Sequence, residues 1–170
     1  MQFQLGVTLR RVANQQQGEK KFDTMINKSI GHLKKATELK AQDATAFNNL
    51  GLSLFEAKKY EEAIECYTKA IVFESQEVKE NRGSEDSLSY YYKNKGLAHY
   101  HRQAEGDYDQ AKQDYDMSIE KNPDNADNYF NLGNVNLTEG EFAEAHKNFD
   151  IAIDKERLNA KYYHAKGLAF

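Results

Sequence analysis

Cysteine, proline and tryptophan are almost missing from this sequence. Its 170 residues include one cysteine, Cys66, one proline, Pro123, and no tryptophan. A single cysteine forms no internal disulfide, which favours a reducing compartment. We therefore expect the cytoplasm, with the nucleus and the cilium as alternatives. Scarce proline, with 39% hydrophobic and 29% charged residues, excludes a disordered or fibrous chain and indicates a helical globular one.

Several other features are missing, and each absence excludes a class of function. No stretch is long and apolar enough to cross a membrane, so we expect no membrane insertion. The first residues lack a basic segment followed by an apolar one, so a secretory signal is not expected. The net charge of −4 argues against nucleic acid, whose binding needs a concentrated basic face. The glycines are scattered singly, which excludes a glycine-rich phosphate loop.

The histidines and the cysteine give no pattern for catalysis or metal binding. His99 and His101 are two residues apart, so on a helix their side chains point in different directions and cannot share a metal. Each of the others lacks a second ligand at helical spacing: His32, His146 and His164. Cys66 stands beside Tyr67 in an apolar pattern that favours a buried, inert thiol. We expect no enzyme activity, no metal and no cofactor.

What the sequence does contain is a repeat. Four glycines each follow an aromatic residue by four positions: Phe47/Gly51, Tyr92/Gly96, Tyr129/Gly133 and Tyr163/Gly167. After the first three glycines comes a second pattern of aromatic, alanine, aromatic and small residue: Tyr60-Ala63-Tyr67-Ala70, Tyr108-Ala111-Tyr115-Ser118 and Phe142-Ala145-Phe149-Ala152. Gly133 and Gly167 are 34 residues apart, a period typical of stacked helix-turn-helix units.

This combination of spacing and residue types resembles the tetratricopeptide repeat (TPR) family. The resemblance implies an all-α fold, a right-handed solenoid of antiparallel helix pairs. Glycine in the first helix and alanine in the second, such as Gly51 and Ala63, allow close approach of the paired backbones. We expect first helices to begin after Asp43, Asn125 and Asn159, whose short polar side chains can cap exposed N–H groups.

The repeat pattern divides the chain into six segments. We expect a degenerate N-terminal helical hairpin at 1–43, TPR units at 44–77, 89–125 and 126–159, an insertion at 78–88, and a partial first helix or cap at 160–170. The hairpin is joined differently from the repeats, near residues 14–21. The insertion is interpreted as a solvated loop or a prolonged helix end outside the stack, because its sequence lacks apolar periodicity. The unit at 89–125 carries a further three-residue turn insertion around 101–106.

Asparagine recurs on the first helices, which line the concave groove of TPR proteins. Asn49, Asn94 and Asn131 each stand two residues before a glycine. A side-chain amide has both donors and an acceptor, so it can pair with the backbone of an extended peptide. This arrangement resembles the asparagine ladder in the TPR superhelix of O-GlcNAc transferase. The alternative is that these are tolerated, exposed helix residues.

Beside the asparagines, the residue after each glycine is Leu52, Leu97 or Asn134, and we expect these to line the groove. Residues four after each glycine are Phe55, Tyr100 and Leu137, and these face either the groove or the core. Such a groove is apolar along one side and polar along the other. It suits an extended segment with alternating apolar side chains or an amphipathic helix.

A second site within the family binds the terminal carboxylate of heat-shock proteins. Lys93, Asn131 and Lys161 occupy three of its five positions, whereas Leu97 and Ala165 replace an asparagine and an arginine. We therefore expect a non-enzymatic scaffold that binds peptide segments of other proteins, in a larger multi-protein assembly. The alternatives are a chaperone-binding co-chaperone domain and a substrate-recruiting arm of a larger enzyme.

Overall fold

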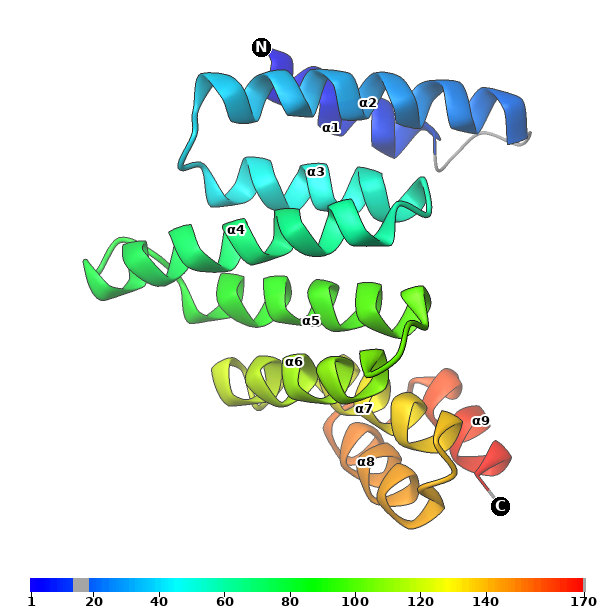
Figure 1. Cartoon of the computed structure of the whole chain (residues 1–170). Coiled ribbons are helices and arrows are strands. Elements are labelled where there is room, and N and C mark those ends of the chain that lie inside the picture. The colour runs from blue at the N-terminus through cyan, green and yellow to red at the C-terminus, as the bar shows by residue number, and fades with distance from the viewer. Residues whose placement is uncertain (14–18, 170) are drawn as a thin grey trace. The chain divides into compact units, whose positions relative to one another are not determined.

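The computed structural model describes residues 1–13 and 19–169, and these residues form only helices and their connections. In chain order the helices are α1 (Gln2–Ala13), α2 (Glu19–Leu39), α3 (Ala44–Glu56), α4 (Tyr60–Lys79), α5 (Glu85–Arg102), α6 (Asp107–Lys121), α7 (Ala126–Thr138), α8 (Phe142–Lys155) and α9 (Ala160–Leu168) (Figure 1). They form two compact units, Met1–Ser84 and Glu85–Phe170, which are described separately.

The first unit consists of two helix pairs, α1 with α2 and α3 with α4, and α2 also packs against α3 (Figure 1). Its core includes Leu33 of α2 and Leu54 of α3, both almost completely buried. The buried Ser29 hydroxyl donates to the Gly6 carbonyl at 2.8 Å and lies 2.9 Å from the Ser53 hydroxyl. This satisfied polar contact ties the first pair to α3. The expected joint near residues 14–21 falls largely outside the described residues.

The second unit repeats the arrangement. α5 packs with α6 and α7 with α8, while α6 contacts α7 and α8 contacts α9. Two apolar clusters lie between successive helices: Ala111, Tyr115, Leu132 and Val135, then Ala145, Phe149, Ala165 and Ala169. In both clusters the second helix of a pair supplies the alanine and the aromatic ring, and the next first helix covers them. Burying the repeated pattern therefore requires stacking of consecutive pairs.

The repeated glycines lie directly against aromatic rings of their own pair. A Cβ atom added to Gly51 would come within 2.6 Å of the Tyr67 ring, and one added to Gly133 within 2.6 Å of the Phe149 ring. At Gly96 the nearest ring atom, of Tyr115, would be 3.1 Å away. The aromatic rings therefore occupy the space left by the glycines within a pair.

Three first helices begin where short polar residues were expected to cap them. Asp43 accepts a hydrogen bond from the Ala46 N–H at 2.9 Å, and Asn125 accepts one from the Asp127 N–H at 3.0 Å. Asn159 does the same for the first turn of α9. These predicted helix starts are confirmed.

The insertion at 78–88 differs from the expected solvated segment. α4 continues to Lys79 and α5 starts at Glu85, so only residues 80–84 lie outside a helix. Leu88 is buried at 3% exposure, and a Cβ on Gly83 would come within 2.6 Å of the Val78 nitrogen. The segment therefore contains the end of α4, a short connection and the start of α5, and Leu88 within it is buried.

The three-residue insertion forms a buried polar cluster in the second unit. Asp107 is 1% exposed and accepts hydrogen bonds from Arg102 and from the Ala104 N–H. His99 Nδ1 lies 3.0 Å from the same carboxylate. The hydrogen bond from Arg102 holds the pKa of Asp107 well below its usual range although burial opposes this. The turn between α5 and α6 is thus fixed by charge as well as by packing.

Candidate functional site

The residues expected to bind a peptide lie on three first helices. Asn49 and Leu52 belong to α3 of the first unit. In the second unit Lys93, Asn94 and Leu97 lie on α5, and Asn131 and Asn134 lie on α7. Since α5 packs with α7, five of the seven residues come from neighbouring helices of one unit.

In the first unit, the side-chain amide of Asn49 is already engaged. Its Nδ2 donates to the Thr45 carbonyl at 2.8 Å, and its Oδ1 lies 3.5 Å from an Arg10 guanidinium nitrogen. Arg10 also forms an ion pair with Glu56 at 3.3 Å. The sequence pattern did not indicate Arg10, because α1 belongs to the degenerate hairpin. A peptide contacting Asn49 would have to compete with these internal hydrogen bonds.

The asparagines of the second unit differ from one another in accessibility. Asn94 is buried at 6% exposure, whereas Asn131 and Asn134 are half-buried. Neither of the two α7 amides hydrogen-bonds to another residue in the part of the chain that the structure describes. Because residues three apart on a helix share a face, Asn131 and Asn134 present adjacent amides on one side of α7. Leu97 is half-buried on the neighbouring α5.

Next to these amides, two lysines act on one carboxylate. We name Lys93, Asp127 and Lys161 the lysine–aspartate cluster. Lys161 of α9 forms a hydrogen-bonded ion pair with Asp127 of α7. The Tyr162 hydroxyl lies 3.0 Å from the same carboxylate and 2.9 Å from that of Glu156, and its one proton can be donated to either of them. The ammonium of Lys161 also stands over the Phe130 ring, 5.0 Å from its centroid, and that of Lys93 stands 4.9 Å from the Tyr90 centroid.

The pKa shifts in the lysine–aspartate cluster agree with this geometry. Burial favours a raised pKa for Asp127, but the hydrogen bonds from Lys161 and Tyr162 and the charges of both lysines lower it. Partial burial lowers the pKa of Lys93, although the Asp127 charge opposes that effect. Asp127 was missed in the sequence. It stands six residues before Gly133, as Lys161 does before Gly167, and opposite charges at equivalent repeat positions could have indicated the pair.

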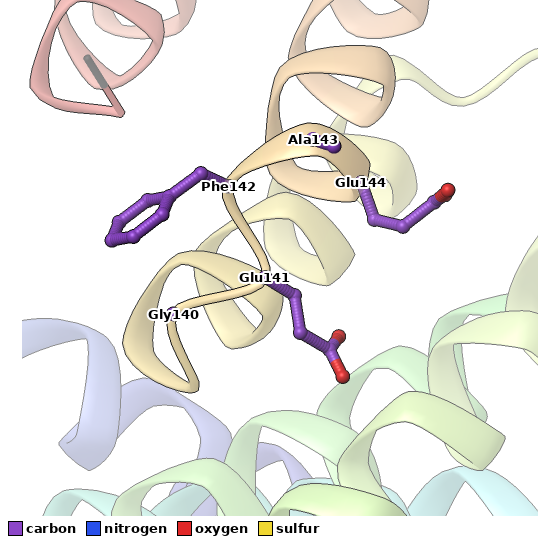
Figure 2. A pocket seen from close by; sticks show the side chains of 5 residues that line it. All are labelled: Gly140, Glu141, Phe142, Ala143 and Glu144. Carbon is purple, nitrogen blue, oxygen red and sulfur yellow. The ribbon is translucent and has the colours of Figure 1, made fainter.

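A surface depression lies at the turn between α7 and α8. Its lining residues in the described part of the chain come from that one turn: Gly140, Glu141, Phe142, Ala143 and Glu144. Figure 2 shows the Phe142 ring pointing away from Glu141 and Glu144. Glu141 forms an ion pair with Lys112 at 2.7 Å. The turn thus presents one exposed ring and two carboxylates.

Metal binding and thiol chemistry find no support in the described residues. Among them there is no cluster of three histidine, cysteine or acidic side chains able to hold a metal ion. Burial raises the pKa of the Cys66 thiol to about 11, so the thiolate is disfavoured near neutral pH. No helix in the same part of the chain is long and apolar enough to span a membrane.

Comparison with known proteins identifies the repeat. The family profile described as tetratricopeptide repeat matches residues 44–76, and one described as TPR repeat matches residues 103–140. The chain is a TPR protein. Its predicted all-α fold of paired helices is thereby confirmed. No curated protein sequence is significantly similar to this TPR chain.

Solved structures share this fold. The crystal structure of MamA is 21% identical over 88% of this TPR chain and 80% of its own, with a TM-score of 0.72. A chain of the APC/C hetero-tetramer Cut9–Hcn1 is 16% identical, with a TM-score of 0.81; the match covers 99% of this chain but only 29% of that one. The first TPR of Spaghetti (RPAP3), bound to the HSP90 peptide SRMEEVD, is 20% identical over 75% of this chain and 93% of its own, with a TM-score of 0.64.

Proposed function

We propose that this TPR protein is a non-enzymatic interaction scaffold, and that the α5–α7 face of its second unit binds an extended peptide segment of a partner protein. The observation that carries the proposal is the pair of half-exposed amides, Asn131 and Asn134, without hydrogen bonds to other described residues. Each amide offers donors and an acceptor to a peptide backbone. Leu97 on α5 adds an apolar contact beside them.

The spacing of the two amides suits an extended peptide. Side chains three residues apart on a helix have Cβ atoms about 5–6 Å apart. Backbone groups on the same side of an extended chain recur about every 6.6 Å. The flexible asparagine side chains can accommodate that small difference, so both can pair with one segment. Because the contacts are to backbone, the identity of the partner is set mainly by neighbouring residues.

The similar TPR domains of RPAP3 support binding of this kind, since they are described in complex with peptides of HSP90 and HSP70. The predicted contributions of Asn49 and Asn94 to a longer ladder stay predictions. They require release of the Asn49 amide from Arg10 and exposure of Asn94. Binding through Asn131 and Asn134 requires neither change.

The test is selection of peptides from a displayed library of random 12-residue sequences, using the full chain. Asn131→Ala with Asn134→Ala should lower the affinity for the selected peptides by about 5- to 150-fold, because each lost hydrogen bond is worth about 0.5–1.5 kcal/mol. Alanine favours helix, so circular dichroism should stay unchanged. Asn27→Ala, at an exposed position of α2, is the matched control and should bind normally. Equal affinity of the double variant and the wild type would contradict the proposal.

A second candidate is the co-chaperone domain. It is favoured by the lysine–aspartate cluster, because Lys93 and Lys161 occupy two positions of the family's carboxylate clamp and both act on one carboxylate. Leu97 and Ala165 stand against it, since they remove an amide and a guanidinium from that clamp. Under this alternative the chain binds SRMEEVD tightly, and Lys93→Ala with Lys161→Ala abolishes binding. Under the scaffold proposal, wild-type binding of SRMEEVD is weak.

A further inference from the structure

The carboxylate of Asp127 already pairs with Lys161, the lysine that an incoming anion would otherwise meet. Lys161 is bound to Asp127 in an ion pair whose side chains are 46% and 43% exposed, so a ligand can reach both. The second α9 lysine with an acidic partner, Lys166, pairs instead with Asp150 of α8. Asp127 therefore lies on α7, the helix that carries Asn131 and Asn134, whereas Asp150 lies on α8.

Position along α7 places Asp127 within reach of a bound peptide. Asp127 and Asn131 are four residues apart, and residues at this spacing lie on the same face of a helix. Asn134 follows one turn later. A segment paired with both amides and continuing along the face passes the lysine–aspartate cluster. Its side chains or its terminal carboxylate would then meet Asp127 directly.

Three features hold Asp127 in place against such a ligand. The hydroxyl of Tyr162, a completely buried residue, lies within hydrogen-bond distance of its carboxylate and of the Glu156 carboxylate. Lys161 is itself held over the Phe130 and Tyr162 rings. Asp127 stands in the first turn of α7, where the helix dipole favours a negative charge. Displacing this carboxylate would break favourable contacts and would leave two carboxylates close together.

We propose that Asp127 is an internal anion that neutralises Lys161, so that this face accepts peptides uncharged beside Asp127 and rejects acidic ones. Asp127 is then a specificity-determining residue, and the proposal rests on the peptide-binding function of the same face. Chemically, the favoured partner is an extended segment whose backbone pairs with Asn131 and Asn134. A carboxylate on that segment lowers its affinity.

The experiment compares two labelled peptides by fluorescence polarisation: SRMEEVD with a free carboxylate, and its SRMQQVN counterpart with an amidated end. Asp127→Asn keeps the acceptor for Tyr162 but removes the charge. It should bind the acidic peptide about tenfold more tightly than the wild type, and this gain should disappear at high salt. The SRMQQVN amide, which carries no carboxylate, should gain no affinity from Asp127→Asn.

Asp150→Asn is the matched control, because it also removes one negative charge and frees one α9 lysine. It should give no gain, and adding Lys161→Ala to Asp127→Asn should cancel the gain. An equal gain in Asp150→Asn, or no gain in Asp127→Asn, would overturn the proposal. Asp127→Ser, whose hydroxyl still suits a helix start, repeats the test if circular dichroism shows that Asp127→Asn is unfolded.

The two proposals fail in different ways. If Asn131→Ala with Asn134→Ala weakens binding of the library-selected peptide while Asp127→Asn gives no gain for SRMEEVD, the role of Asp127 is wrong and the binding face is supported. If the double asparagine variant binds the library-selected peptide as the wild type does, the peptide-binding function of this face is contradicted.

Discussion

Adding one methyl group at Gly51 should destabilise the first unit, whereas adding one at Gly31 should stabilise it. Both glycines lie within helices of that unit. The new Cβ at Gly51 would come within 2.6 Å of the buried Tyr67 ring, but the space around Gly31 is open to 4 Å. Replacing glycine by alanine inside a helix gains about 0.5–1 kcal/mol, and overpacking a core costs about 1–3 kcal/mol.

The helix gain is common to both variants, so their difference isolates the steric cost. Gly31→Ala should raise the free energy of unfolding by about 0.5–1 kcal/mol, and Gly51→Ala should lie about 1–3 kcal/mol below it. Urea unfolding followed by circular dichroism measures both. Gly133→Ala and Gly167→Ala form a second pair of variants, because Gly133 faces the Phe149 ring whereas Gly167 faces open space. Equal stability of Gly51→Ala and Gly31→Ala would refute the ring-against-glycine packing.

Two further predictions concern the insertions. Leu88→Ala should lower the free energy of unfolding by about 2–5 kcal/mol because Leu88 is buried. Substitution of the exposed residues 80–82 should change it by less than about 0.5 kcal/mol in urea titrations. Equal effects of the two changes would show that Leu88 is not in the core. Asp107→Asn should cost about 1.5–3 kcal/mol at neutral pH. Since the folded state lowers the pKa of Asp107, its contribution is present above the ordinary value of 3.8 and is lost as the pH falls below it. In urea titrations across this pH range, the free energy of unfolding should fall more steeply with acid in the wild type than in Asp107→Asn. Parallel pH dependence of the two proteins would contradict the stabilising role of Asp107.

The helix pairs could be predicted because their signals are local. Each signal involves residues only a few positions apart in the sequence. One is the glycine four residues after an aromatic, and the other is the short polar residue before a helix start. The same local signals fail at 78–88. Whether Leu88 belongs to a loop or to a buried helix face depends on what packs against it, and the polar sequence around it conceals that contact.

The site was predictable only in part for a similar reason. Asn49 and Asn131 stand at the same repeat position, and a sequence pattern treats them alike. Their surroundings differ, because α1 brings Arg10 to Asn49, while the side-chain amide of Asn131 has no hydrogen-bonding partner among the described residues. The degenerate sequence of the first hairpin carries no signal for the position of Arg10. Asp127 could have been found only by comparing the charges at equivalent positions of adjacent repeats.

The side-chain amide signals of Asn131 and Asn134 test the binding face most directly. In proton–nitrogen correlation spectra of the full chain, titration with a peptide selected from the library should shift both pairs of amide signals, with the same dissociation constant as fluorescence polarisation. The signals of Asn27, on the exposed surface of α2, should stay in place. Saturating peptide that leaves the Asn131 and Asn134 signals unmoved would contradict the proposal that this face binds the peptide.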